Sequence, residues 1–126
     1  MGNLLETGAS WLADQLKANV STEVVYARDL EQVPVQATIG KTEFEIDDGS
    51  GIVERFQSRD YLIHAADLVL GGTESLPEAG DKIHESHGGT TLVYEVASPG
   101  NEPCWRYSDP FRTLLRIHTK HVATVT

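Results

Sequence analysis

The chain has 126 residues, of which 40% are hydrophobic, and 19 acidic residues against 10 basic ones give a formal net charge of −9. This length predicts one domain, spanning residues 1–126. The acidic balance argues against a nucleic-acid-binding surface, because such surfaces bind phosphates with Lys and Arg. No apolar run approaches the roughly 20 residues of a membrane helix. The single cysteine, Cys104, excludes an intrachain disulfide and is typical of a reducing compartment.

The N-terminal segment predicts a helix over residues 4–19. Its apolar residues recur at helical spacing and form one stripe, made of Leu5, Ala9, Leu12, Ala13, Leu16 and Val20. Glu6 near the start and Lys17 near the end complement the helix dipole. The segment lacks the basic start and the long apolar stretch of a signal peptide, so we expect synthesis in a cytoplasm.

After the predicted helix, the hydrophobic pattern changes from helical to alternating. Val24 and Tyr26 predict a first strand, and the alternation over residues 33–39 predicts a second, half-buried one. Pro34 inside the second strand indicates an edge position, because proline cannot donate a ladder hydrogen bond. Gly40 and Lys41 then predict a turn or a bulge.

Residues 43–56 predict a hairpin with an acidic tip. Apolar Phe44 and Ile46 alternate with acidic neighbours, and residues 47–51 read Asp-Asp-Gly-Ser-Gly, which is a strong turn signal. Residues 52–56 return as the partner strand. The carboxylates at this tip lack the spaced ladder of a calcium loop, so we expect them to be solvated.

The second half of the chain continues as short strands closed by turn residues. We expect a strand over 59–64, one helical turn over 65–68, a loop over 71–80, strands around a Gly88-Gly89 turn, and closing strands over 105–107 and 113–120. Turn signals at this density predict a mainly β fold. The expected architecture is a small antiparallel β-barrel or sandwich over residues 23–122, with one N-terminal helix and extended loops.

Two histidine pairs are the first candidates for chemistry. His84 and His87 stand three residues apart, as do His118 and His121. Residues three apart in a strand point to opposite faces, so a metal site would need a turn within a pair and a third ligand from Asp81, Glu85 or His64. We expect surface histidines instead, with His118 outward beside Arg116 and Lys120, and we predict no metal and no cofactor.

Two groups of residues are candidates for protein interfaces. The first is the acidic hairpin, represented by Glu45, Asp47, Asp48 and Glu54. The second is the alternating triplet Trp105, Arg106 and Tyr107, because Trp, Tyr and Arg are enriched at interface hot spots. Core packing is the alternative for the two aromatic rings. No nucleophile motif surrounds Cys104, and the glycines fit turns better than a phosphate-binding loop, so we predict no catalytic residue.

The order of the C-terminal pieces resembles phage head–tail joining proteins, the small neck proteins that close or adapt the filled head. The resemblance rests on short motifs, namely Pro77, Gly80-Asp81 and Ile83, Gly88-Gly89, Tyr94-Glu-Val96, and Arg112-Thr-Leu-Leu-Arg116-Ile117. It implies a prophage-encoded structural protein of the virion, made in the bacterial host cytoplasm, with no enzymatic activity. It also implies a homo-oligomeric ring, of six subunits in many such proteins, between the portal or adaptor and the tail proteins, with DNA passing through its channel.

The residues leave two other functions open. One is a metal-dependent small β-barrel enzyme that uses His84, His87 and Asp81. The other is a non-catalytic module that binds a peptide or a small ligand, for which a deep apolar pocket would be the signature. No membrane partner is expected.

Overall fold

The computed structural model describes residues 21–47, 49–100 and 102–126. The helix predicted over residues 4–19 lies outside the described residues. Among those that are described, the elements in chain order are β1 (Ser21–Arg28), β2 (Glu31–Asp47), β3 (Val53–His64), the 3-10 helix η1 (Ala65–Asp67), β4 (Val69–Leu70), β5 (Thr73–Glu74), β6 (Lys82–His87), β7 (Thr90–Val96), β8 (Trp105–Tyr107) and β9 (Leu114–Val125). No helix in the described part of the chain is long and apolar enough to cross a membrane.

One antiparallel sheet closes on itself and forms the barrel. Its strand order is β3-β2-β1-β6-β7-β9-β8, and an additional pairing of β3 with β9 joins the two sides. The short strand β8 lies against the first half of β9, while β7 pairs with the second half of β9. The prediction of a mainly β, antiparallel barrel is therefore confirmed.

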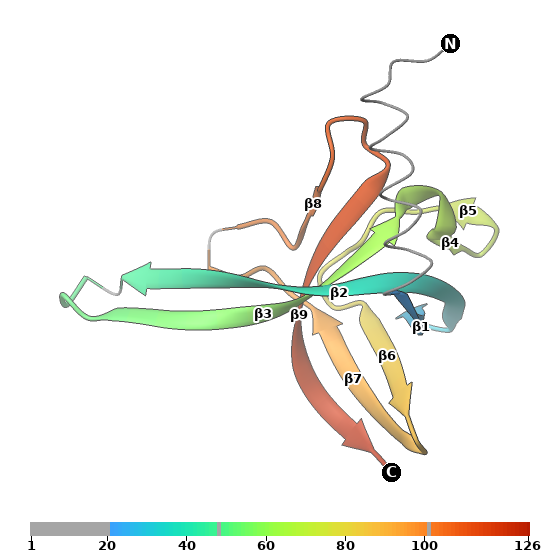
Figure 1. The fold of residues 1–126 in the computed structure, drawn as a ribbon, viewed down its shortest axis with the longest axis horizontal. Helices are drawn as coiled ribbons and strands as arrows, with labels where there is room; N and C mark the ends of the chain where they lie inside the picture. Colours follow the sequence, from blue (N-terminus) through green and yellow to red (C-terminus); the bar gives the residue numbers. More distant parts are fainter. Residues whose placement is uncertain (1–20, 48, 101) are drawn as a thin grey trace.

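Strands β2 and β3 are longer than the barrel needs. The first half of β2 pairs with β1 over residues 31–38, and β2 then pairs with β3 from Ala37 to Asp47. Strand β9 joins β3 only from Arg59 onward. The outer parts of β2 and β3, residues 41–47 and 53–59, project from the barrel as a two-stranded arm (Figure 1). We call these residues the arm.

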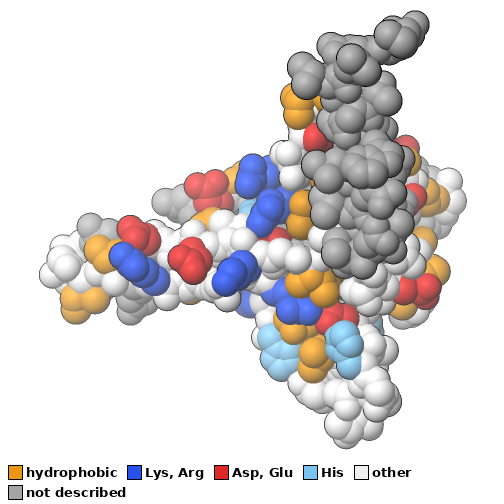
Figure 2. Space-filling model, viewed as in Figure 1, with side chains coloured by type: hydrophobic (Ala, Val, Ile, Leu, Met, Phe, Trp, Pro, Cys, Tyr) orange, Lys and Arg blue, Asp and Glu red, His pale blue; other side chains and the backbone are white. Residues whose placement is uncertain are grey.

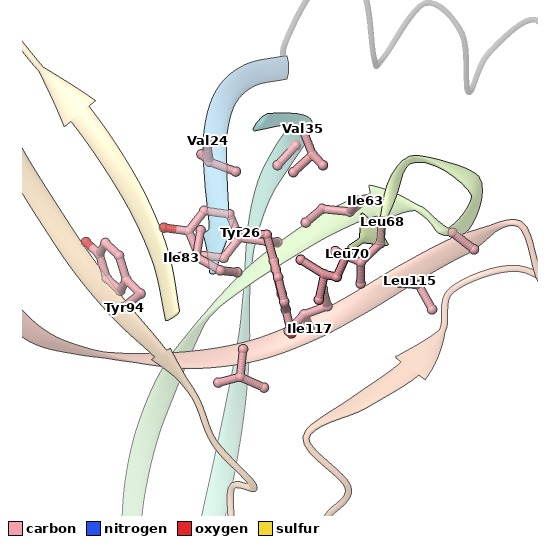
Figure 3. Close-up of a cluster of buried hydrophobic side chains, with 14 residues drawn as sticks. Val24, Tyr26, Val35, Ile63, Leu68, Leu70, Ile83, Tyr94, Leu115 and Ile117 are labelled. Carbon is pink, nitrogen blue, oxygen red and sulfur yellow. The ribbon is translucent and has the colours of Figure 1, made fainter. Parts of the chain in front are cut away.

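The barrel encloses the hydrophobic core, which Figure 3 shows in close-up. Side chains from β1, β2, β3, β6, β7 and β9 point inward at alternate positions, as a half-buried antiparallel sheet requires. Tyr26, Tyr61, Ile63, Ile83 and Ile117 are each 0% exposed. Leu68, directly after η1, and Leu70 of β4 add to the same cluster.

Several local predictions are confirmed and two are wrong. The hairpin, the helical turn after His64 and the Gly88-Gly89 turn occur as expected. Pro34 lies in the part of β2 that pairs with β1 on one side only. Pairing with β3 on the other side begins at Ala37, so Pro34 faces an open edge of β2. The turn or bulge predicted at Gly40 is absent, because β2 runs straight through it with Gly40 paired to Asp60. The other error concerns His118, which lies on the outer face of β9 as predicted but is buried rather than exposed.

Candidate assembly surfaces

The arm is held by an unbroken ladder and an aromatic pair. Its register runs from Lys41 opposite Arg59 to Asp47 opposite Val53. The rings of Phe44 and Phe56 stack with centroids 5.2 Å apart. Aromatic cross-strand pairs stabilise a two-stranded ribbon, which alone is marginal in water. In the part of the chain that is described, no third strand pairs with the arm beyond Arg59.

A buried carboxylate fixes the base of the arm. Asp60 on β3 is 0% exposed and accepts hydrogen bonds from Arg116 Nε at 2.7 Å, His118 Nδ1 at 2.8 Å and Ser58 Oγ at 2.5 Å. Thr42 Oγ1 on β2 also donates to Asp60. The cluster links β2, β3 and β9 where the arm leaves the barrel. This also explains the wrong prediction for His118: its ring lies between Asp60 and Phe44, whose centroid is 5.4 Å away.

The hydrogen bonds keep Asp60 ionised. Burial alone would raise the pKa of this carboxyl group, but donors on His118, Ser58, Thr42 and Arg116 outweigh burial, and its pKa lies well below its ordinary value. Breaking such a cluster leaves an uncompensated buried charge, which is far more costly than losing an exposed pair. The charged hydrogen-bond cluster around Asp60 therefore anchors the arm to the barrel.

Two further carboxylates flank Ile83 on the inward face of β6. Glu85 is 1% exposed and accepts from both Arg59 Nη2, at 2.8 Å, and the Tyr61 hydroxyl, at 2.7 Å. Asp81, just before β6, accepts from Arg28 Nη2 at 2.8 Å and from the Tyr26 hydroxyl. Each carboxylate thus receives one guanidinium and one phenol. These two groups tie β1 and β3 to β6 through side chains.

Opposing effects act on both carboxylates and set their charge. Burial would raise the pKa of Glu85, but hydrogen bonds from Arg59, His87 and Tyr61 lower it below its usual range. Asp81 is lowered in pKa in the same way, chiefly by Arg28 and Tyr26 against the effect of burial. Burial first, and then the neighbouring carboxylate, raises the pKa of the Tyr61 phenol. Each acid therefore stays charged and its phenol stays a donor.

The proposed metal ligands do not converge. His87 Nε2 binds Glu85, and Asp81 is occupied by Arg28 and Tyr26. His84 lies on the opposite face of β6 from both, because strand positions alternate. Within the residues that the structure describes, no group of three or more His, Cys, Asp or Glu side chains could hold a metal ion.

The β8 triplet is divided between two faces. Trp105 and Tyr107 pack partly against the core, with ring centroids 5.1 Å apart, and Arg106 between them is exposed. Core packing therefore accounts for a large part of both rings. Figure 1 shows β8 and the arm leaving the barrel in different directions. The two groups of candidate interface residues are thus separate surfaces and do not form one patch.

An open groove of about 730 Å³ lies between the base of the arm and strands β7 and β9. Its walls are Ile39, Gly40, Lys41, Gln57, Ser58, Arg59, Tyr94, Thr119, Lys120 and His121. Arg59 lies over the Tyr94 ring, with Cζ 5.0 Å from the centroid. No local sequence pattern indicates this groove, because its walls come from four segments, on β2, β3, β7 and β9, that only the barrel brings together.

A small antiparallel β-barrel with a projecting arm is the class of protein that this geometry defines. The sequence model of the phage head-tail joining protein family matches residues 2–126, and the chain belongs to that family. Membership indicates a structural role in the phage virion, in contact with other head and tail proteins. No curated protein sequence matches the chain.

The buried carboxylates Asp60 and Glu85 were missed at the level of sequence. Both stand in strands of alternating pattern, where an acidic residue ordinarily marks the solvent face. The available signal was the pairing of each with arginine in a facing strand, Arg116 with Asp60 and Arg59 with Glu85. That signal becomes readable only once the strand register is known.

Proposed function

We propose that this chain forms a closed ring at the neck of a tailed-phage particle, between the portal or adaptor and the tail proteins. It acts through subunit interfaces and has no active site of its own. Membership of the head-tail joining family supports the neck position. The observation that carries the proposal is the arm, a two-stranded projection of residues 41–47 and 53–59 anchored to the barrel.

A ring suits such a projecting arm for a physical reason. Each copy offers one arm and one barrel, so contacts that are weak between two copies become strong when they close in a circle. The candidate contact residues are Glu45, Asp47 and Glu54 of the arm, Asp48, which lies outside the described residues, and Trp105, Arg106 and Tyr107 of β8. Six subunits is the ring size that we expect.

The net charge of −9 fits a channel that conducts DNA without holding it. Phosphates are attracted by Lys and Arg and repelled by a surplus of carboxylates. DNA would therefore pass the ring without specific binding. The charge also gives solubility, so it supports the proposal without carrying it.

Deleting the arm in the phage tests the proposal. A variant in which a Gly-Gly turn replaces residues 44–56 keeps the barrel and removes the projection. We expect it to fail to restore particles when it replaces the wild-type gene, leaving heads and tails unjoined in electron micrographs. Matched controls are the wild-type gene and a variant with exposed Glu102→Gln, both of which should restore joined particles. Normal joining by the arm-deleted chain would contradict the proposal.

A further inference from the structure

The groove at the base of the arm is basic in an acidic protein. Its ten lining residues include Lys41, Arg59, Lys120 and His121 but no Asp or Glu, although acidic residues outnumber basic ones 19 to 10 in the chain. In Figure 2, most basic side chains on this face lie where the arm joins the body, and acidic side chains lie farther out along the arm. The groove is thus a local site of positive charge.

Two of these cations have no partner within the chain as described. Neither the Lys41 nor the Lys120 ammonium group forms an ion pair with a described residue, and both side chains are exposed. Arg59 is neutralised by Glu85 but keeps 32% of its side chain exposed. Two unpaired lysines among the residues that line the groove fit a ligand that carries carboxylates or phosphates.

The arm itself carries the complementary charge. Residues 43–54 contain Glu43, Glu45, Asp47, Asp48 and Glu54, and no basic residue lies between them. Glu43 and Glu45 are exposed, and Arg55 near the tip forms an ion pair with Glu45, at 3.2 Å. From Gly40 to Asp47 the arm extends roughly 23 Å, at about 3.3 Å per strand residue. It therefore reaches well beyond its own barrel.

The arm cannot occupy the groove of its own chain. Lys41 and Arg59, which lie opposite each other at the base of the arm, are themselves walls of the groove. The strands run outward from that base with continuous register, and bringing the tip back would break the ladder. An acidic arm in this groove must therefore belong to another copy.

We propose that the acidic arm of one copy lies in the basic groove of the next copy, with Glu43 and Glu45 facing Lys41 and Lys120. The contact joins different surfaces of the two copies, so it is head-to-tail and closes into a ring when the rotation permits. This inference rests on the proposed neck ring and specifies how its subunits are joined. It also gives the unpaired lysines a partner of opposite charge.

Charge exchange between two variants tests the docking. The groove variant is Lys41→Glu with Lys120→Glu, and the arm variant is Glu43→Lys with Glu45→Lys. Their matched controls are Lys82→Glu with Arg112→Glu, and Glu74→Lys with Glu102→Lys, which change the net charge equally at sites outside the groove and the arm; Lys82 is half-buried and pairs with Glu95, and the other three are exposed. Self-association of each full-length chain is measured by sedimentation velocity in low and high salt, after its cooperative unfolding has been checked.

We expect wild type and both controls to associate in low salt, and less in high salt. Each test variant alone should associate at least about tenfold more weakly, because like charges then face each other. An equal mixture of the two test variants should regain association, since each arm then meets a groove of opposite charge. No loss in either variant, or no recovery in the mixture, would overturn the docking. So would a wild-type chain that stays monomeric up to about 1 mM, the weak end of the affinity scale.

A second readout separates this inference from the neck role. If both test variants restore joined particles in the phage as well as wild type does, the docking is wrong and the neck role stands. If the purified chains exchange partners as expected but the gene is dispensable for joining, the neck role is wrong and the docking stands. A groove that binds duplex DNA through Lys41 and Lys120, with self-association unaffected by either variant, would assign the lysines to phosphate and overturn the docking.

Discussion

Removing the charge of Asp60 should destabilise the protein more than any exposed acidic substitution. Asp60→Asn keeps the size of the side chain but leaves the Arg116 guanidinium without its anion, and one of the donors from Ser58, Thr42 and His118 then faces an amide NH₂. Breaking one partner of a buried ion pair costs about 3–5 kcal/mol. Because the Arg116 side chain is 19% exposed and water reaches it in part, we expect the lower end, about 3 kcal/mol.

Urea unfolding measures this loss. With a slope of about 1–3 kcal/mol per molar urea, the midpoint should fall by about 1–3 M without a change in slope. Exposed Asp29, at φ 54°, provides the control. Asp29→Asn should stay within about 0.5 kcal/mol of wild type, because asparagine tolerates the left-handed region. A cost below about 1 kcal/mol for Asp60→Asn would refute the view that this carboxylate anchors the arm.

Three other outcomes are expected. Stability should fall as the pH drops below about 4, because the pKa values of Asp60, Asp81 and Glu85 are lower in the folded state than in the unfolded state. The stability that these carboxylates contribute is complete above their ordinary pKa of about 4. It is lost as the pH falls toward their folded-state pKa values. Urea midpoints against pH should show this slope, and an equally steep slope in Asp60→Asn would contradict it. Phe56→Ala should speed amide hydrogen exchange in the arm about tenfold, since the stacked Phe44–Phe56 pair contributes about 0.5–1.5 kcal/mol beyond its burial. Exchange of the β6 amides should stay unchanged. Equal acceleration in the arm and in β6 would show that the arm does not open separately from the barrel. Burial, followed by the nearby Asp81 and Glu78, raises the pKa of the Cys104 thiol, so its reaction with a chromogenic disulfide should reach half its maximal rate above the free-thiol value of about 8.5, and a midpoint at or below that value would refute this.

The barrel was predictable because alternation and turn chemistry agree over most of the chain. Val24 and Tyr26 predict a first strand and the alternation from Val33 a half-buried second one, and the structure has both, with Val24 and Tyr26 in the core. Gly40 misled, because a glycine in a strand usually marks a bend. Here Arg116 Nη2 and Leu62 Cδ1 would each lie 3.4 Å from an added Cβ. These are ordinary van der Waals contacts, so neither packing nor a turn requires glycine at position 40.

His118 was mispredicted for a different reason. Alternation assigns one face of β9 to the core and the other to solvent, and Ile117 is on the core side. The base of the arm then covers the outer face, where Asp60 and Phe44 enclose the His118 ring. The contact that buries His118 joins residues 58 positions apart in the sequence. No local pattern around His118 indicates that a second element covers this face. The groove was invisible for the same reason.

The continuity of β2 and β3 from the barrel into the arm has a mechanical consequence. No hinge interrupts either strand, so a pull on the tip passes along two covalent chains into the barrel wall. There it loads eight register pairs between β1 and β2, and six between β3 and β9. The force acts in shear, parallel to the strands, so all these pairs resist it at the same time. A ladder loaded in this way resists far more tension than one opened pair by pair from its end. A force applied to the tip of the arm is therefore carried by the whole barrel wall.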